Sequence, residues 1–197
     1  MDIQKVTLKL FTDEPATVNL DPFLAIFARW RHDRADPAEW VDLADYAHVS
    51  KGPGVVLIGQ QGNLAIDFSE PGAGILWSNK RHLQGDIEQR IFETFRRTVR
   101  LACRLISEPE YPEPFKARVG FWELSFNDRL NLPNNSDTDR MLRAPTEAVL
   151  NSLLGSGSYL LIRQSDPNRR YGFVIHCDTL DSLDTLVVKL ENGSVTS

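Results

Sequence analysis

The chain has 197 residues, of which 42% are hydrophobic and 25% are charged, so its composition is that of a globular protein and excludes a fibrous or disordered chain. Its length suits one large domain, because single cores stop growing only at roughly 250 to 300 residues. The net charge of -5 argues against nucleic-acid and anionic-membrane partners, since both require a positive surface field. We therefore expect one globular domain over 1–197.

Targeting signals and metal motifs do not stand out. No stretch is apolar over the roughly 20 residues that a membrane helix needs. Residues 1–5 lack the features of a signal peptide, which predicts a cytoplasmic protein. Cys103 and Cys177 are too few for a disulfide scaffold, and neither has zinc-site spacing. We expect two buried thiols, with neither a metal nor a cofactor.

One strand and one helix are predicted at the start of the chain. Residues 3–11 alternate in polarity, which predicts a half-exposed strand with its apolar side chains inward and Lys9 in water. Asp21 followed by Pro22 has the chemistry of a helix N-cap and a first helical residue. The same pair at 36–37 predicts one more helical turn.

Residues 41–78 change to strand patterns. A continuous apolar run at 55–58 suits a central strand, and alternating segments at 64–68 and 74–77 follow it. The connections are too short to hold helices. We therefore expect an antiparallel meander and no parallel crossover.

The clearest helix is predicted to begin at Asp86, where Gln89 completes a capping box, and to present one apolar stripe as far as Ile106. Prolines at 108–114 end this helix and mark a subdivision of the domain. Five arginines on the helix either bind an anion or form a solvated face: Arg90, Arg96, Arg97, Arg100 and Arg104.

The remaining elements complete a sheet. A strand is predicted at 119–126, and a helix at 137–154 that is broken or kinked at Pro145 and ended by Gly155. Further strands are predicted at 159–163, 171–176 and 186–190. About three helices and seven or eight mainly antiparallel strands predict an α+β fold, with the helices packed against the sheet.

Polar groups concentrate at 42–49. An extended chain there would put Asp42, Tyr46 and His48 on one side, with Asp45 nearby, and an aspartate and a histidine within reach of a metal or a hydroxyl are usable chemistry. The alternative is that the histidine orients the tyrosine or caps a turn.

A second candidate group follows the strand at 119–126. Asn127, Asp128 and Arg129 stand at a strand end, where binding groups are often displayed, and the last two could hold a carboxylate or a phosphate. The alternative is that they satisfy backbone groups in the loop. Strand parity carries Asp128 toward the core side, where loop N–H groups or an arginine would have to bind it.

Two stretches of the chain resemble an uncharacterised bacterial protein family. They are residues 41–49 with 52–59, and residues 127–130 with 133–134. The resemblance covers most of the chain. It implies a bacterial, cytosolic, single-domain protein and carries no activity.

No catalytic constellation stands out, which favours a noncatalytic binding or assembly protein that forms a homo-oligomer through a sheet edge or an aromatic surface. The alternative is a small enzyme, a hydrolase or transferase, acting on an anionic small molecule. It requires Asp42, His48, Asp128 and Arg129 to share one cleft.

Overall fold

The strands and helices follow each other in this order along the chain. The strands are β1 (Val6–Thr12), β2 (Trp40–Asp45), β3 (Val55–Gly59), β4 (Gly62–Asp67), β5 (Gly74–Asn79), β6 (Ala117–Phe126), β7 (Leu160–Arg163) and β8 (Gly172–His176). The helices are α1 (Asp21–His32), α2 (Ile87–Ile106), α3 (Ser136–Leu154) and α4 (Leu183–Asn192). These bounds come from a computed structural model that describes residues 2–13, 18–33, 39–180 and 182–192.

All eight strands form one sheet in the order β2-β3-β4-β5-β1-β6-β8-β7. Every neighbouring pair is antiparallel, and β2 to β5 form the predicted meander. β1 lies between β5 and β6, so the chain on both sides of the proline loop at 108–114 contributes to one sheet. The fold is α+β, as the sequence predicts.

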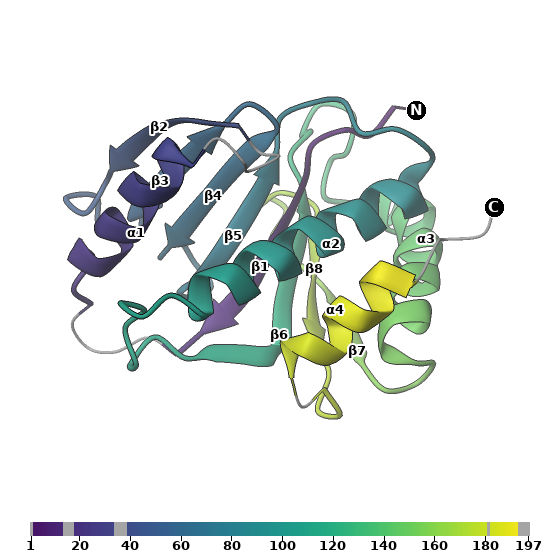
Figure 1. Cartoon of the computed structure of the whole chain (residues 1–197). Helices are drawn as coiled ribbons and strands as arrows, with labels where there is room; N and C mark the ends of the chain where they lie inside the picture. The colour runs from purple at the N-terminus through teal and green to yellow at the C-terminus, as the bar shows by residue number, and fades with distance from the viewer. Residues whose placement is uncertain (1, 14–17, 34–38, 181, 193–197) are drawn as a thin grey trace.

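The helices pack on one face of the sheet. In Figure 1, α1, α2 and α4 cross in front of the sheet, and α3 stands beside it on the right. α1 packs on β2 and β3, while α2 crosses β1 and β5 and contacts α3 and α4. The largest side chains of the resulting core include Trp30, Trp77 and Trp122, each at most 1% exposed. None of the helices in the described ranges is both long and apolar enough to span a membrane.

α2 begins as the sequence predicts. The side chain of Asp86 accepts a hydrogen bond from the backbone N–H of Gln89 at 2.9 Å, and the side chain of Gln89 accepts one from the backbone N–H of Asp86 at 3.0 Å. The arginines of this helix contact different parts of the fold. Arg90 donates to the carbonyl of Ile3, and Arg104 stacks on Trp30 at 4.0 Å. Four of the five, Arg90, Arg96, Arg100 and Arg104, each form an ion pair within the chain.

Two predicted details at the ends of the chain are wrong. Residues 183–192 form α4, where a strand was predicted at 186–190; Leu183, Leu186 and Leu190 are its buried residues, and this spacing of three and four is helical. Asp21 is the first residue of α1 rather than its N-cap, and Asn19 accepts its N–H at 3.0 Å. The helical turn predicted at 36–37 lies outside the described residues.

α3 is one helix across Pro145. Asn135 caps its start, because its side chain accepts hydrogen bonds from Asp137 and Thr138. Gly155, at a φ of 95°, ends it as predicted.

Candidate functional site

The face of the sheet opposite the helices is called the open face below. β1 turns Leu8 and Leu10 toward the helices, so Thr7 and Lys9 point to the open face. The strand register puts Lys9 directly beside Glu123 of β6. The loop between β4 and β5 and the loop between β7 and β8 contribute further polar groups to this face.

Lys9 is buried under the open face. Its side chain is only 1% exposed, and its Nζ donates to Asp67 Oδ2 at 2.6 Å and to the carbonyl of Ser69 at 2.8 Å. All seven residues of β1 are buried, so the prediction of a half-exposed strand with Lys9 in water is wrong. The reason is that β1 is an inner strand whose polar face contacts the β4–β5 loop, and a buried ammonium group needs a partner.

Asp67 anchors the β4–β5 loop. Ser69 Oγ lies 2.6 Å from Oδ1 and 2.5 Å from Oδ2 of this carboxylate, in addition to the contact with Lys9. Both carboxylate oxygens are therefore engaged. This arrangement fixes Ser69 and Glu70 at the rim of a cleft.

The cleft lies on the open face and has a volume of about 260 Å³. It is lined by residues of β1, β4, β5 and β6 and of the adjoining loops: Thr7, Asp67, Ser69, Glu70, Leu76, Glu123, Ser125, Arg129, Arg169 and Arg170. Hydroxyl groups, carboxylates and guanidinium groups thus converge in one small volume. Such convergence of polar groups is typical of a ligand site.

Every acidic side chain that lines the cleft has a cationic partner. The ion pairs are Asp67 with Lys9 at 2.6 Å, Glu70 with Lys51 at 2.6 Å, and Glu123 with Arg169 at 3.4 Å. Hydrogen bonding to Lys51 lowers the pKa of Glu70. The carboxylates therefore already have counter-charges within the protein.

Glu123 belongs to β6, the strand between β1 and β8, and its side chain is 16% exposed. Burial raises its pKa above the ordinary value, and the positive charges of Arg169 and Lys9 oppose this effect without cancelling it. The folded structure therefore favours the protonated form of Glu123 more than water does. Such a group can donate a hydrogen bond to a ligand as well as accept one.

Two guanidinium groups of the cleft remain free to bind a ligand. Arg129 and Arg170 are exposed and form no salt bridge with any residue that the structure describes. Because the acids are paired, these two arginines leave the cleft with an excess of positive charge, although the protein as a whole has a net charge of -5. Arginine binds carboxylates and phosphates through two parallel hydrogen bonds.

Hydroxyl groups on the inner strands add neutral hydrogen-bonding groups. Thr7 and Ser125 line the cleft, and the register pairs them directly. Thr7 Oγ1 also lies 3.3 Å from Ser78 Oγ. Among the described residues, no cluster of three or more histidine, cysteine, aspartate or glutamate side chains could hold a metal ion. The neutral and positive groups that line the cleft are thus hydroxyl groups and arginines, with the Glu123 carboxyl beside them.

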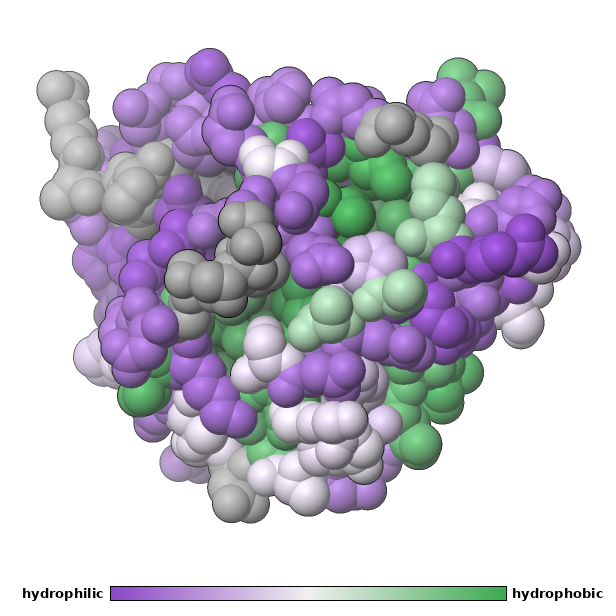
Figure 2. Space-filling view, turned by 90° about the vertical axis from the view of Figure 1, so that its right-hand side faces the viewer, coloured by the Kyte–Doolittle hydropathy of each residue, from purple (hydrophilic) through white to green (hydrophobic). Residues whose placement is uncertain are grey.

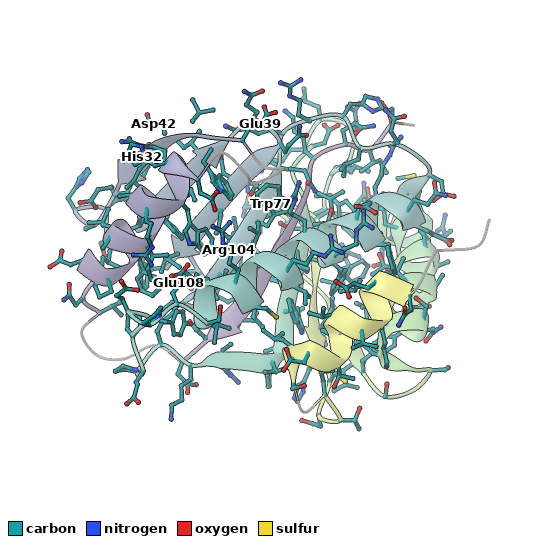
Figure 3. The ribbon with its side chains drawn as sticks, in the orientation of Figure 1. His32, Glu39, Asp42, Trp77, Arg104 and Glu108 are labelled. Carbon is teal, nitrogen blue, oxygen red and sulfur yellow. The ribbon has the colours of Figure 1, made fainter. Side chains whose placement is uncertain are left out.

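The two candidate groups from the sequence lie far apart. β2 and β6 are separated by four strands, which is roughly 24 Å at the usual strand spacing, and they run in opposite directions. The chain after Asp45 and the chain after Phe126 therefore leave opposite ends of the sheet. In Figure 3, Asp42 lies beside His32 at the outer edge of the molecule. The structure does not bring Asp42 and His48 together with Asp128 and Arg129.

The residues at 42–49 make local contacts. Asp42 accepts the N–H of Leu43 at 2.8 Å and lies 3.8 Å from Arg31. Asp45 Oδ1 accepts the N–H of Ala47 at 2.8 Å, which caps the turn after β2. The side chains that follow this turn, Tyr46 and His48, are exposed, with ring centroids 6.4 Å apart.

The residues at 127–129 divide between two roles. The backbone N–H of Asn127 donates to the carbonyl of Lys5. Asp128 accepts hydrogen bonds from the backbone and side chain of Asn131 at 3.2 and 2.8 Å, which lower its pKa. The expected loop N–H partner is present, but Asp128 does not approach the core. Of this group, Arg129 lines the cleft.

Most residues of the cleft were missed from the sequence. The sequence predicts that Lys9 faces water. Glu123, Arg169 and Arg170 belong to segments without a motif. The available signal was a lysine at the centre of a strand whose neighbours are nearly all apolar or β-branched. That pattern fits an inner strand as well as an edge strand, and only the sheet order distinguishes the two.

A second cleft, of about 620 Å³, lies between the end of α2, the proline loop and the start of α4. Its lining combines apolar residues with four charged ones, Glu108, Glu113, Lys116 and Asp184. It is larger than the cleft on the open face, but three of these four charges are negative and no arginine of the described ranges lines it. We therefore take the smaller cleft as the candidate site.

Comparison with known proteins gives no further guidance on this site. The chain matches no family model, and no curated protein matches it.

Proposed function

We propose that this protein is a noncatalytic binding protein that holds a small anionic molecule in the cleft on the open face. The observation that carries the proposal is the charge pattern of the cleft. Its three acidic residues are each paired, whereas Arg129 and Arg170 have no salt-bridge partner among the described residues. An anion would supply the missing counter-charge.

The size of the cleft narrows the class of ligand. A volume of about 260 Å³ is slightly below the usual range for drug-sized molecules, which begins at roughly 300 Å³. A phosphate ester or a small carboxylic acid would fit such a volume. Thr7 and Ser125 would then bind oxygen atoms of the ligand that the arginines do not reach.

Calorimetric titration with inorganic phosphate, sulfate and succinate tests the proposal. Chloride at matched ionic strength controls for general screening. We expect saturable binding of at least one of these anions, weakened at least about tenfold when both Arg129→Ala and Arg170→Ala are introduced. Arg140→Ala is the matched control, because Arg140 is an arginine on α3 whose side chain is 79% exposed.

Two results would overturn the proposal. One is the absence of saturable binding for all three anions. The other is an equal loss of binding in Arg140→Ala, which would indicate that only net charge matters.

A small enzyme acting on an anionic molecule is the second candidate function. The observation that favours it is Glu123, whose raised pKa is typical of groups that act as general acids. Turnover of p-nitrophenyl phosphate or p-nitrophenyl acetate that is lost in Glu123→Gln, with anion binding retained, would move this candidate ahead of the first.

The cellular setting belongs to the same proposal. The resemblance of the sequence to a bacterial family supports a bacterial origin, and the free thiols of both cysteines support a cytoplasmic location. The net charge of -5 supports a protein without a nucleic-acid partner. Fractionation of the source cells would test the location.

A further inference from the structure

The strand β7 ends the sheet on one side and exposes apolar side chains. Leu160 is 60% exposed and Ile162 is 55% exposed. The register places Ile162 beside Val174, which lies beside Glu123, so Leu160 and Ile162 belong to the open face. Figure 2 views the molecule from the side on which α3 lies and shows hydrophobic areas between hydrophilic residues there.

The backbone of β7 offers hydrogen-bonding groups at this edge. The N–H of Gln164 donates to the carbonyl of Gly172 in β8. Since alternate residues of an antiparallel strand face the same neighbour, Ile162 and Leu160 also face β8, and Leu161 and Arg163 face outward. The carbonyl of Leu161 accepts a hydrogen bond from Arg143 at 3.5 Å, which agrees with a carbonyl that points away from β8. This hydrogen bond is long, so a shorter one to the backbone of another strand could replace it.

The opposite edge of the sheet is built differently. β2 has an irregular register between Trp40 and Asp42, and it carries the charged side chains of Asp42 and Asp45. Bulges and charges are the usual means by which edge strands avoid pairing with another chain. The middle of β7 has neither, since Leu160, Leu161 and Ile162 are all apolar and Arg163 stands at its end.

We propose that β7 is a self-association strand, which pairs antiparallel with β7 of a second copy of this chain about a two-fold axis through Leu161. The register of such a pair follows from symmetry. Leu161 faces Leu161 of the other copy with both backbone hydrogen bonds, and Leu160 faces Ile162. The exposed apolar side chains therefore meet each other in both halves of the interface.

In the next pair of this register, Tyr159 of one copy would face Arg163 of the other, on the side of the helices. Both side chains are held within their own copy, since Tyr159 donates to Asn151 of α3 at 3.0 Å and Arg163 donates to Asn134 at 3.2 Å. The match between the copies therefore rests on the apolar residues at 160–162. A sequence that matches itself in this way fits a second copy of the chain better than an unrelated partner. The side chains of β7 thus favour a second copy of this chain as the partner at this edge.

Pairing of β7 would join two sheets into one. The two clefts would lie on the same face, and the β6 strands at their near sides would be five strand spacings apart, or about 24 Å. The inference rests on the edge strand and not on ligand binding, so either proposal can fail without the other.

Sedimentation velocity over a wide range of protein concentration tests self-association. We expect a monomer–dimer equilibrium whose dissociation constant rises at least about tenfold in Ile162→Lys, because a lysine then occurs twice in the interface. The matched controls are Leu130→Lys, at a loop residue that is 95% exposed, and Val41→Lys, at a residue of β2 that is 59% exposed. Neither control should change the equilibrium.

A monomer at all concentrations would overturn the proposal. So would a dimer that Val41→Lys weakens and Ile162→Lys does not, since the opposite edge would then be responsible. Circular dichroism should show unchanged folding in all three variants, because each replaces an exposed side chain.

Disulfide trapping tests the register. Leu161→Cys places two thiols opposite each other about the axis, within the Cα separation of 4.4 to 6.8 Å that disulfides usually span. We expect a covalent dimer after mild oxidation of this variant and little from Leu160→Cys, whose counterpart is Ile162. The unsubstituted protein, which keeps Cys103 and Cys177, is the control and should stay uncrosslinked. Equal crosslinking of the two variants would contradict the proposed axis.

Discussion

The Nζ atom of Lys9 lies 2.6 Å from Oδ2 of Asp67, and the two side chains are 1% and 7% exposed. Lys9 is in β1 and Asp67 ends β4, with β5 between them. The residue of β5 beside Asp67 is Gly74, and a Cβ atom there would come within 2.9 Å of Lys9 Cγ. The glycine thus leaves room for the lysine to cross β5 and reach its partner.

The first prediction concerns this buried pair. Lys9→Met removes the ammonium group and leaves the Asp67 carboxylate buried with Ser69 as its remaining side-chain donor. We expect the free energy of unfolding to fall by about 3 to 5 kcal/mol, which is the usual cost of removing one partner of a buried ion pair and leaving the other charge unpaired. Urea denaturation followed by fluorescence measures the change.

The double variant Lys9→Met with Asp67→Leu is the control for this prediction. Replacing both charges with apolar side chains removes the uncompensated charge, so most of the lost stability should return. A double variant that is as unstable as Lys9→Met would indicate that the methylene groups of Lys9, and not its charge, stabilise the fold.

The sequence predicts the local character of β1 but not its environment. Alternating polarity identifies the strand and the face that turns toward the helices. It cannot reveal that β1 pairs with β5 and β6 or that the β4–β5 loop supplies a carboxylate to Lys9, since Asp67 is 58 residues away. The sheet order and the cleft depend on such distant pairings, and no local pattern encodes them.

Elements with strong local signals agree with the prediction. The capping box at Asp86 and the glycine at 155 fix the ends of α2 and α3 through contacts within one helical turn. α4 was mistaken for a strand because a five-residue window, 186–190, contains too few residues to separate the two periodicities. Of the candidate site residues, Arg129 lines the cleft, because its strand end lies next to β1.

The second prediction concerns the two thiols. Burial, and to a smaller extent the negative charge of Asp184, raise the pKa of Cys103 to about 11. Cys103 lines the second cleft and is half-buried, whereas Cys177 is 2% exposed. Because the thiolate is the reactive species, we expect iodoacetamide to label Cys103 roughly a hundredfold more slowly than an ordinary thiol at neutral pH.

Mass spectrometry of the labelled protein over time measures this rate. Labelling of Cys103 should accelerate with rising pH up to about 11, and Asp184→Asn should accelerate it modestly at a fixed pH. Cys177 should react only after denaturation. Rapid labelling of both thiols in the native protein would contradict the burial of these groups.

The third prediction concerns Glu123, whose pKa burial raises above its unfolded value of about 4.3. The folded state therefore binds this proton more tightly than the unfolded state does. Its contribution to stability is fully present below pH about 4.3 and is lost as the pH rises through the folded pKa. Glu123→Gln cannot ionise and escapes this loss.

We therefore expect the midpoint temperature of Glu123→Gln, relative to that of the unsubstituted protein, to rise between pH about 4 and neutral pH. A difference of about 1 kcal/mol corresponds to roughly 2 to 4 °C in the midpoint for a chain of this size. Calorimetry in low-phosphate buffers avoids occupying the cleft. Glu191→Gln, at a glutamate of α4 whose side chain is 53% exposed and lies 3.4 Å from Arg100, controls for the loss of one exposed carboxylate that has an arginine partner. A midpoint of Glu123→Gln that falls, relative to that of the unsubstituted protein, as the pH rises would contradict this prediction. It would show that Arg169 stabilises the carboxylate more than burial destabilises it. The pKa of Glu123 would then be lowered, and Glu123 could not act as the acid of the cleft.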